Sequence, residues 1–143
     1  MKFWNSCTEF GLIVLFLTII GAEHSLAALP LQVGVYRSAG NRYIEIAEKE
    51  NRLCLRNYSY KGVVVASVAA DTQRQNFYKI NGYGGYDGTF LLQQDTETLL
   101  FGSVNHLIKY VADHSFPTTE LDDDLQECLS SQKPFFKRKD PSR

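Results

Sequence analysis

The side chains that most often perform catalysis are scarce in this sequence. His106 and His114 are the two histidines beyond the amino-terminal segment, and Asp113 stands directly before the second. A carboxylate that orients a histidine beside a nucleophile could serve a small hydrolase, although a structural or solvated histidine is the simpler interpretation. The histidine spacing matches no zinc motif, and the acidic run 122–124 lacks the ligand pattern of a calcium loop. We therefore predict no metal site and no cofactor, and we lean away from an enzyme.

Side chains suited to recognition are concentrated in a glycine-rich segment, residues 82–88 (GYGGYDG). Its glycines flank Tyr83, Tyr86 and Asp87, and tyrosine combines a large contact area with a polar hydroxyl. We predict that these three residues contribute to a loop that binds a ligand or a partner protein. The alternative is a turn in which the glycines supply positive φ angles.

A second candidate binding surface is built from arginine and tyrosine. Arg52 and Arg56 alternate along one predicted strand and share a face with Tyr58. Such a face can bind anions or a partner protein through charge-assisted hydrogen bonds and aromatic contacts. The same alternation is equally typical of the solvated side of an antiparallel sheet. A helix tied to this face would weaken the case for an anion site.

Two cysteines, Cys54 and Cys128, remain once the amino-terminal segment is set aside. An even pair in a small exported domain most simply forms one disulfide. The alternative is two separately buried thiols. The predicted disulfide would close a long loop, for which the chain-entropy model gives a stabilisation of about 4 kcal/mol.

The amino-terminal segment, residues 1–27, has the features of a secretory signal peptide. Lys2 precedes an uncharged, mostly apolar run at 10–21 (FGLIVLFLTIIG), and Ser25 and Ala27 are the small residues expected before a cleavage site. The alternative is a membrane anchor, but a spanning helix needs about 20 apolar residues. We therefore expect a secreted or periplasmic protein with no membrane span after cleavage.

The remaining chain predicts one mainly β domain at residues 28–133, a small antiparallel barrel or sandwich of seven to eight strands with one carboxyl-terminal helix. The evidence is a series of short runs that alternate or carry β-branched residues, separated by turn residues. Over the whole chain 15 basic side chains nearly balance 16 acidic ones, so no net electrostatic field favours the binding of nucleic acid. The predicted strands are 34–38, 42–47, 52–59, 63–69, 77–80, 89–94, 98–103 and 106–110.

The hairpin at residues 43–60 gives the clearest prediction of which side chains enter the core. Ile44 and Ile46 share one face of its first strand, and Leu53 and Leu55 share one face of its second. Since side chains alternate across a strand, these four residues should face the core and Cys54 should face outward.

The last part of the chain changes character. We predict a helix over about 118–131, capped by Thr118 or Thr119 and followed by acidic residues that favour a helix start. Its apolar face carries Cys128 and three leucines, so it should pack on the strands. Residues 134–143 include the run KRK at 137–139, and we predict a basic flexible tail there.

Two resemblances add to this interpretation. Tyr36, the run RYIEI at 42–46, RLC at 52–54 and ASV at 66–68 resemble small secreted proteins of cyanobacteria, a group that implies no particular activity. The strand count, the late helix and the strand-to-carboxyl-end disulfide are similar to the lipocalin-like plan, whose Gly-x-Trp opening is echoed by Gly34 and Tyr36.

We predict an exported, non-enzymatic binding or protein-interaction module as the function. A lipocalin-like carrier of a small apolar ligand and a small hydrolase are the alternatives. An internal apolar cavity of a few hundred Å³ would favour the carrier, whereas a filled core with an exposed Tyr/Arg face would favour protein interaction.

Overall fold

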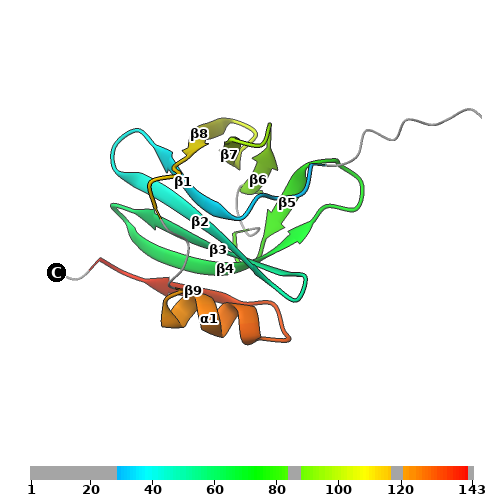
Figure 1. Cartoon of the computed structure of the whole chain (residues 1–143), viewed down its shortest axis with the longest axis vertical. Coiled ribbons are helices and arrows are strands. Elements are labelled where there is room, and N and C mark those ends of the chain that lie inside the picture. Colours follow the sequence, from blue (N-terminus) through cyan, green and yellow to red (C-terminus); the bar gives the residue numbers. More distant parts are fainter. Residues whose placement is uncertain (1–28, 84–87, 117–120, 142–143) are drawn as a thin grey trace, which may run out of the picture.

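Eight antiparallel strands close into a barrel in this protein, whose computed structural model describes residues 29–83, 88–116 and 121–141 (Figure 1). Each strand pairs with the next, and β1 pairs with β8 to close the ring. The predicted mainly β class is confirmed, as a barrel and not a sandwich. The strands are β1 (Gly34–Ser38), β2 (Arg42–Lys49), β3 (Arg52–Ser59), β4 (Gly62–Ala70), β5 (Phe77–Ile80), β6 (Phe90–Gln93), β7 (Thr98–Ser103) and β8 (His106–Ala112).

The inward faces of these strands form a buried apolar cluster inside the barrel. In the β2–β3 hairpin Ile46 pairs with Leu55, and both are almost fully buried together with Ile44. Leu53 packs against the same cluster, so the predicted inner face of the hairpin is confirmed. The buried interior residues are Leu31, Tyr36, Ile44, Ile46, Leu55, Ala66, Val68, Tyr78, Ile80, Leu91, Leu99, Phe101 and Tyr110.

One end of the barrel is plugged by the segment that precedes β1. Leu31 enters the interior cluster, and two buried tyrosines fix the backbone around it. Tyr36 Oη donates to the carbonyl of Gln32 at 2.9 Å, and Tyr78 Oη donates to the carbonyl of Leu29 at 3.0 Å. This crossing segment, blue in Figure 1, therefore closes the end that carries the β2–β3, β4–β5 and β6–β7 connections.

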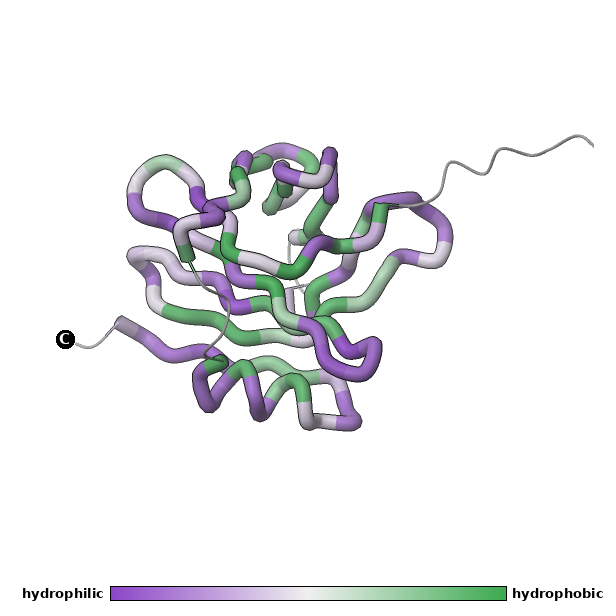
Figure 2. The backbone as a smooth tube through the Cα atoms, viewed as in Figure 1, coloured by the Kyte–Doolittle hydropathy of each residue, from purple (hydrophilic) through white to green (hydrophobic). Residues whose placement is uncertain are grey.

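The helix α1 (Asp123–Ser130) covers the outer face of β2, β3 and β4. Its buried residues Leu125, Cys128 and Leu129 pack on Cys54 and Val65, and Cys54 forms the predicted disulfide with Cys128. In Figure 2 hydrophobic residues recur along this helix between hydrophilic ones, as an amphipathic helix requires.

The helix starts later than the sequence pattern predicts. Asp122 has an extended backbone and accepts a hydrogen bond from the amide of Leu125, so this aspartate caps the helix. The predicted caps, Thr118 and Thr119, lie outside the described residues, as does the predicted signal peptide at 1–27.

The predicted flexible tail is wrong in its central part, because residues Phe136–Lys139 form a ninth strand, β9. It pairs with the first half of β4, where Ala66 lies opposite Phe136, while the second half of β4 pairs with β5. Lys137 and Lys139 hold the β9 strand to α1 through the buried carboxylate of Asp124. Their charges therefore belong to a tertiary contact, which the run of basic residues alone does not reveal.

The Asp124 contact predicts an acid-dependent loss of stability. Hydrogen bonds from Lys137 and Lys139 hold the pKa of Asp124 below its usual range. A carboxylate with a lowered folded pKa stabilises the protein above its unfolded pKa, about 3.9, and loses this effect as the pH falls through the folded pKa. We therefore expect Asp124→Asn to lower the free energy of unfolding at neutral pH, with the difference from wild type shrinking in acid.

Urea unfolding followed by circular dichroism from about pH 7 to about pH 2 measures this difference. Asp123→Asn is the matched control, because it removes the same charge from an exposed position in the same helical turn. A deficit of Asp124→Asn that stays constant down to the lowest pH would contradict the assignment.

Candidate functional site

The end of the barrel opposite the plug holds a cavity of about 610 Å³. Alternate turns of an up-and-down barrel lie at the same end, and the β1–β2, β3–β4 and β7–β8 turns surround this opening. We call it the open end. Its apolar wall consists of Val64, Tyr83, Phe101, Ile108, Tyr110 and Phe136.

Four aromatic rings in this wall contact one another edge to face. Tyr83 lies 5.8 Å from Phe101 and 6.0 Å from Phe136, measured between ring centroids, and Phe101 lies 6.1 Å from Tyr110. Gly82 makes the approach of Phe136 possible, because a Cβ atom there would lie 2.2 Å from the phenylalanine ring. The β9 strand thus completes the wall where the first half of β4 does not pair with β5.

Asn57 places a polar group in this otherwise apolar interior. Its side chain belongs to the inward face of β3, only 8% of the residue is exposed, and Nδ2 donates to Tyr83 Oη at 3.2 Å. The buried Oδ1 has no hydrogen-bond partner among the described residues. Exchanging the two ends of the amide would only move the unpartnered position to the nitrogen.

Basic side chains surround the opening. Arg42, Lys61, His106 and Arg138 line the cavity, and none of the lining residues that the structure describes is acidic. Burial raises the pKa of Tyr110 and of Tyr83, while the charge of Arg42 acts in the opposite direction on Tyr110 and that of Arg138 on Tyr83. The positive charges of Arg42 and Arg138 therefore partly offset the effect of burial on the pKa of these two tyrosine hydroxyls.

The predicted site residues are distributed over different parts of the molecule. Tyr83 lies in the wall of the open end, whereas Tyr86 and Asp87 are outside the described residues. Arg52 and Arg56 contact the helix side of the barrel. Arg52 Nε donates to the carbonyl of Cys128 at 2.6 Å, and Arg56 pairs with Glu45 and with the helix cap.

Sequence reasoning missed Asn57, Arg42, Phe136 and Arg138. The alternation that places Leu53 and Leu55 inside also places Asn57 inside, so this residue could have been found. No local pattern indicates that β9 would bring Phe136 and Arg138 to the opening, because its place depends on pairing with distant β4.

The residues considered for hydrolysis do not form a catalytic arrangement. His114 Nε2 lies 2.6 Å from Glu97 Oε2 at an exposed position, while Asp113 pairs with Arg37 and Ser115. Within the described residues no group of three or more potential metal ligands occurs. No helix in the described ranges is long and apolar enough to cross a membrane.

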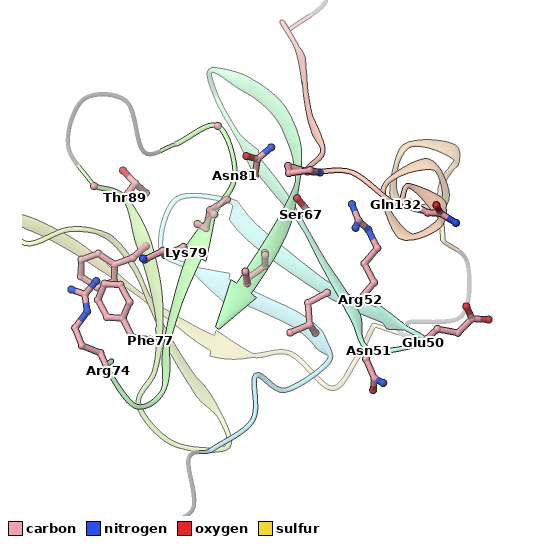
Figure 3. Close-up of a pocket in the computed structure, with 18 of the residues that line it drawn as sticks. Glu50, Asn51, Arg52, Ser67, Arg74, Phe77, Lys79, Asn81, Thr89 and Gln132 are labelled. Carbon is pink, nitrogen blue, oxygen red and sulfur yellow. The ribbon is translucent and has the colours of Figure 1, made fainter. Parts of the chain in front are cut away.

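A second, outer groove of about 930 Å³ runs between the β2–β3 turn, β4–β5 and residues 132–134. Figure 3 shows Arg52 and Gln132 on one side of it and Arg74, Phe77 and Lys79 on the other. The cations of this groove are engaged elsewhere: Arg74 and Lys79 pair with Asp71, and Arg52 binds backbone carbonyls beside the helix. The open end therefore carries the stronger evidence for a ligand.

Comparisons of this chain with protein-family models, with curated proteins and with solved structures gave no match.

Proposed function

We propose that this protein is a non-enzymatic binding protein that takes a small amphipathic molecule into the open end of its barrel. The observation that carries the proposal is the asymmetry of the barrel, plugged at one end and hollowed at the other. The cavity of about 610 Å³ lies within the range typical of small-molecule sites. Such sites combine apolar walls with a few polar groups, as here.

Asn57 supports the proposal from inside the cavity. A buried polar atom without a partner costs about 1–3 kcal/mol of stability, so its retention needs a reason. A ligand with a hydroxyl or amide group would pair with the free end of the Asn57 amide. Tyr83 would then contribute both a ring surface and a hydroxyl next to this contact.

The place of action that we propose is outside the cytoplasm, either secreted or periplasmic. The disulfide between Cys54 and Cys128 supports this, since disulfides persist mainly in oxidising compartments. The predicted signal peptide at residues 1–27 is the second support. A ligand carrier fits this setting, because it needs neither a cofactor nor an energy source.

Filling the cavity should abolish binding of a neutral apolar probe. Ile108 lines the open end, whereas its neighbour Leu107 is 42% exposed and belongs to the outer face of β8. We expect N-phenyl-1-naphthylamine to bind wild type with enhanced fluorescence and Ile108→Trp at least about tenfold more weakly, because the indole occupies the space of the probe. Leu107→Trp, the matched control, should bind like wild type.

Thermal melts of both variants establish that they are folded. Should Ile108→Trp lack a cooperative melt, Val64→Phe adds less volume to the same cavity and replaces it. Absence of probe binding to wild type, or equal binding to the filled and control variants, would refute the proposed function.

A further inference from the structure

We propose that the open end selects an organic anion, a molecule with one negatively charged group and an apolar body. The charged group is held at the rim by Arg42, Lys61 and Arg138, and the body lies against the aromatic wall. This inference rests on the proposed function and names the chemical class of its ligand.

Charge is unevenly distributed over the protein surface, with basic side chains gathered at the open end. Acidic residues slightly outnumber basic ones in the whole chain, 16 against 15, yet among the described residues no carboxylate lines the open end. The three permanent cations come from separate parts of the chain, the start of β2, the β3–β4 turn and β9. Local composition of one segment does not account for their meeting, which results from barrel closure and from the added strand.

The three cations at the open end are available to a ligand. The Arg42 guanidinium and the Lys61 ammonium group lie 5.4 and 5.7 Å from the ring centroid of Tyr60, and neither pairs with a carboxylate in the described part of the chain. Arg138 has one acidic partner, Asp140, at 3.3 Å. Both members of this pair are largely exposed, and such pairs are weak.

Other basic residues of the molecule, in contrast, form ion pairs with carboxylates. Arg37 pairs with Asp113, Arg56 with Glu45, and Lys137 with Asp124. These contacts join strands and helix to one another. The cations at the open end instead surround a cavity, where Arg42 and Lys61 lie near the ring of Tyr60.

The side chains of the rim favour one kind of charged group. Guanidinium groups bind carboxylates and sulfonates through charge-assisted hydrogen bonds, which are stronger than neutral ones. At the mouth of an apolar cavity such a bond orients the ligand with its charge outward. The inner end of the ligand then reaches the aromatic wall and the free polar atom of Asn57.

A matched pair of ligands tests this selectivity in the exported protein. We expect 1-naphthoate to bind at least about tenfold more tightly than 1-naphthalenemethanol, which has the same ring and no charge, in calorimetric titrations at low ionic strength. In Arg42→Gln/Arg138→Gln the naphthoate affinity should fall at least about tenfold while the alcohol affinity stays within about twofold. Added salt should weaken naphthoate binding only.

Lys49→Gln/Lys109→Gln is the matched control, because it removes two exposed cations that do not line the open end. An equal loss of naphthoate affinity in this control would overturn the inference, since overall charge would then explain it. Equal affinities of wild type for acid and alcohol would also overturn it, while the proposed function stands. Failure of both ligands and of the neutral probe would refute the proposed function itself.

Discussion

Replacing both bridged cysteines in Cys54→Ala/Cys128→Ala is expected to lower the free energy of unfolding by about 4 kcal/mol. The bond joins residues 74 positions apart, so it strongly restricts the unfolded chain. Small domains have a total stability of only about 5–15 kcal/mol, and this loss is a large part of it. Urea unfolding followed by circular dichroism measures the change, and tyrosine fluorescence provides a second probe.

The reduced wild-type protein is the control for this variant. Both should show a lowered midpoint, because both lack the covalent bond that joins β3 to α1. Hydrogen exchange should increase most in α1 and β9, which depend on the outer cluster around the disulfide. A variant that unfolds like oxidised wild type would contradict a stabilising role for the bond.

The barrel strands could be predicted because each has a local cause. Ile44 and Ile46 alternate with polar neighbours, and the turn after β2 places Glu50 and Asn51 at positive φ, where asparagine is tolerated well. Closure of the ring could not be predicted in the same way. The pairing of Tyr36 with Ala112 joins strands far apart in the chain, and no local pattern records such a contact.

The residues of the candidate site also divide into those with a local signal in the sequence and those placed by distant contacts. Tyr83 could be predicted because it stands in a glycine-rich segment, and Asn57 could be placed inside by counting along β3. Arg138 could not be predicted as a site residue, because a run of basic residues indicates a solvated segment unless its acidic partners are known. Those partners, above all Asp124 for the neighbouring lysines, lie on a helix whose position only the fold defines.

Arg56→Met is expected to destabilise the protein by about 3–5 kcal/mol, because it leaves a buried carboxylate without its cation. Glu45 is 5% exposed, and its Oε2 lies 2.5 Å from a terminal nitrogen of Arg56. The same guanidinium contacts Asp122, which caps α1, so it joins β2, β3 and the helix. Burial opposes the charged guanidinium, but the charges of Glu45 and Asp122 raise the pKa of Arg56 overall.

Two further variants distinguish the effect of the unpaired buried charge on stability from the effect of lost side-chain packing. Arg52→Met removes an arginine from the same face of β3 that binds backbone carbonyls and, among the described residues, no carboxylate. It should cost only about 1–2 kcal/mol in the same urea titration. Glu45→Met/Arg56→Met removes both buried charges and should be more stable than Arg56→Met alone. If the double variant is instead less stable than the single one, the unpaired Glu45 carboxylate is not the cause of the loss, and the arginine acts through its packing against α1.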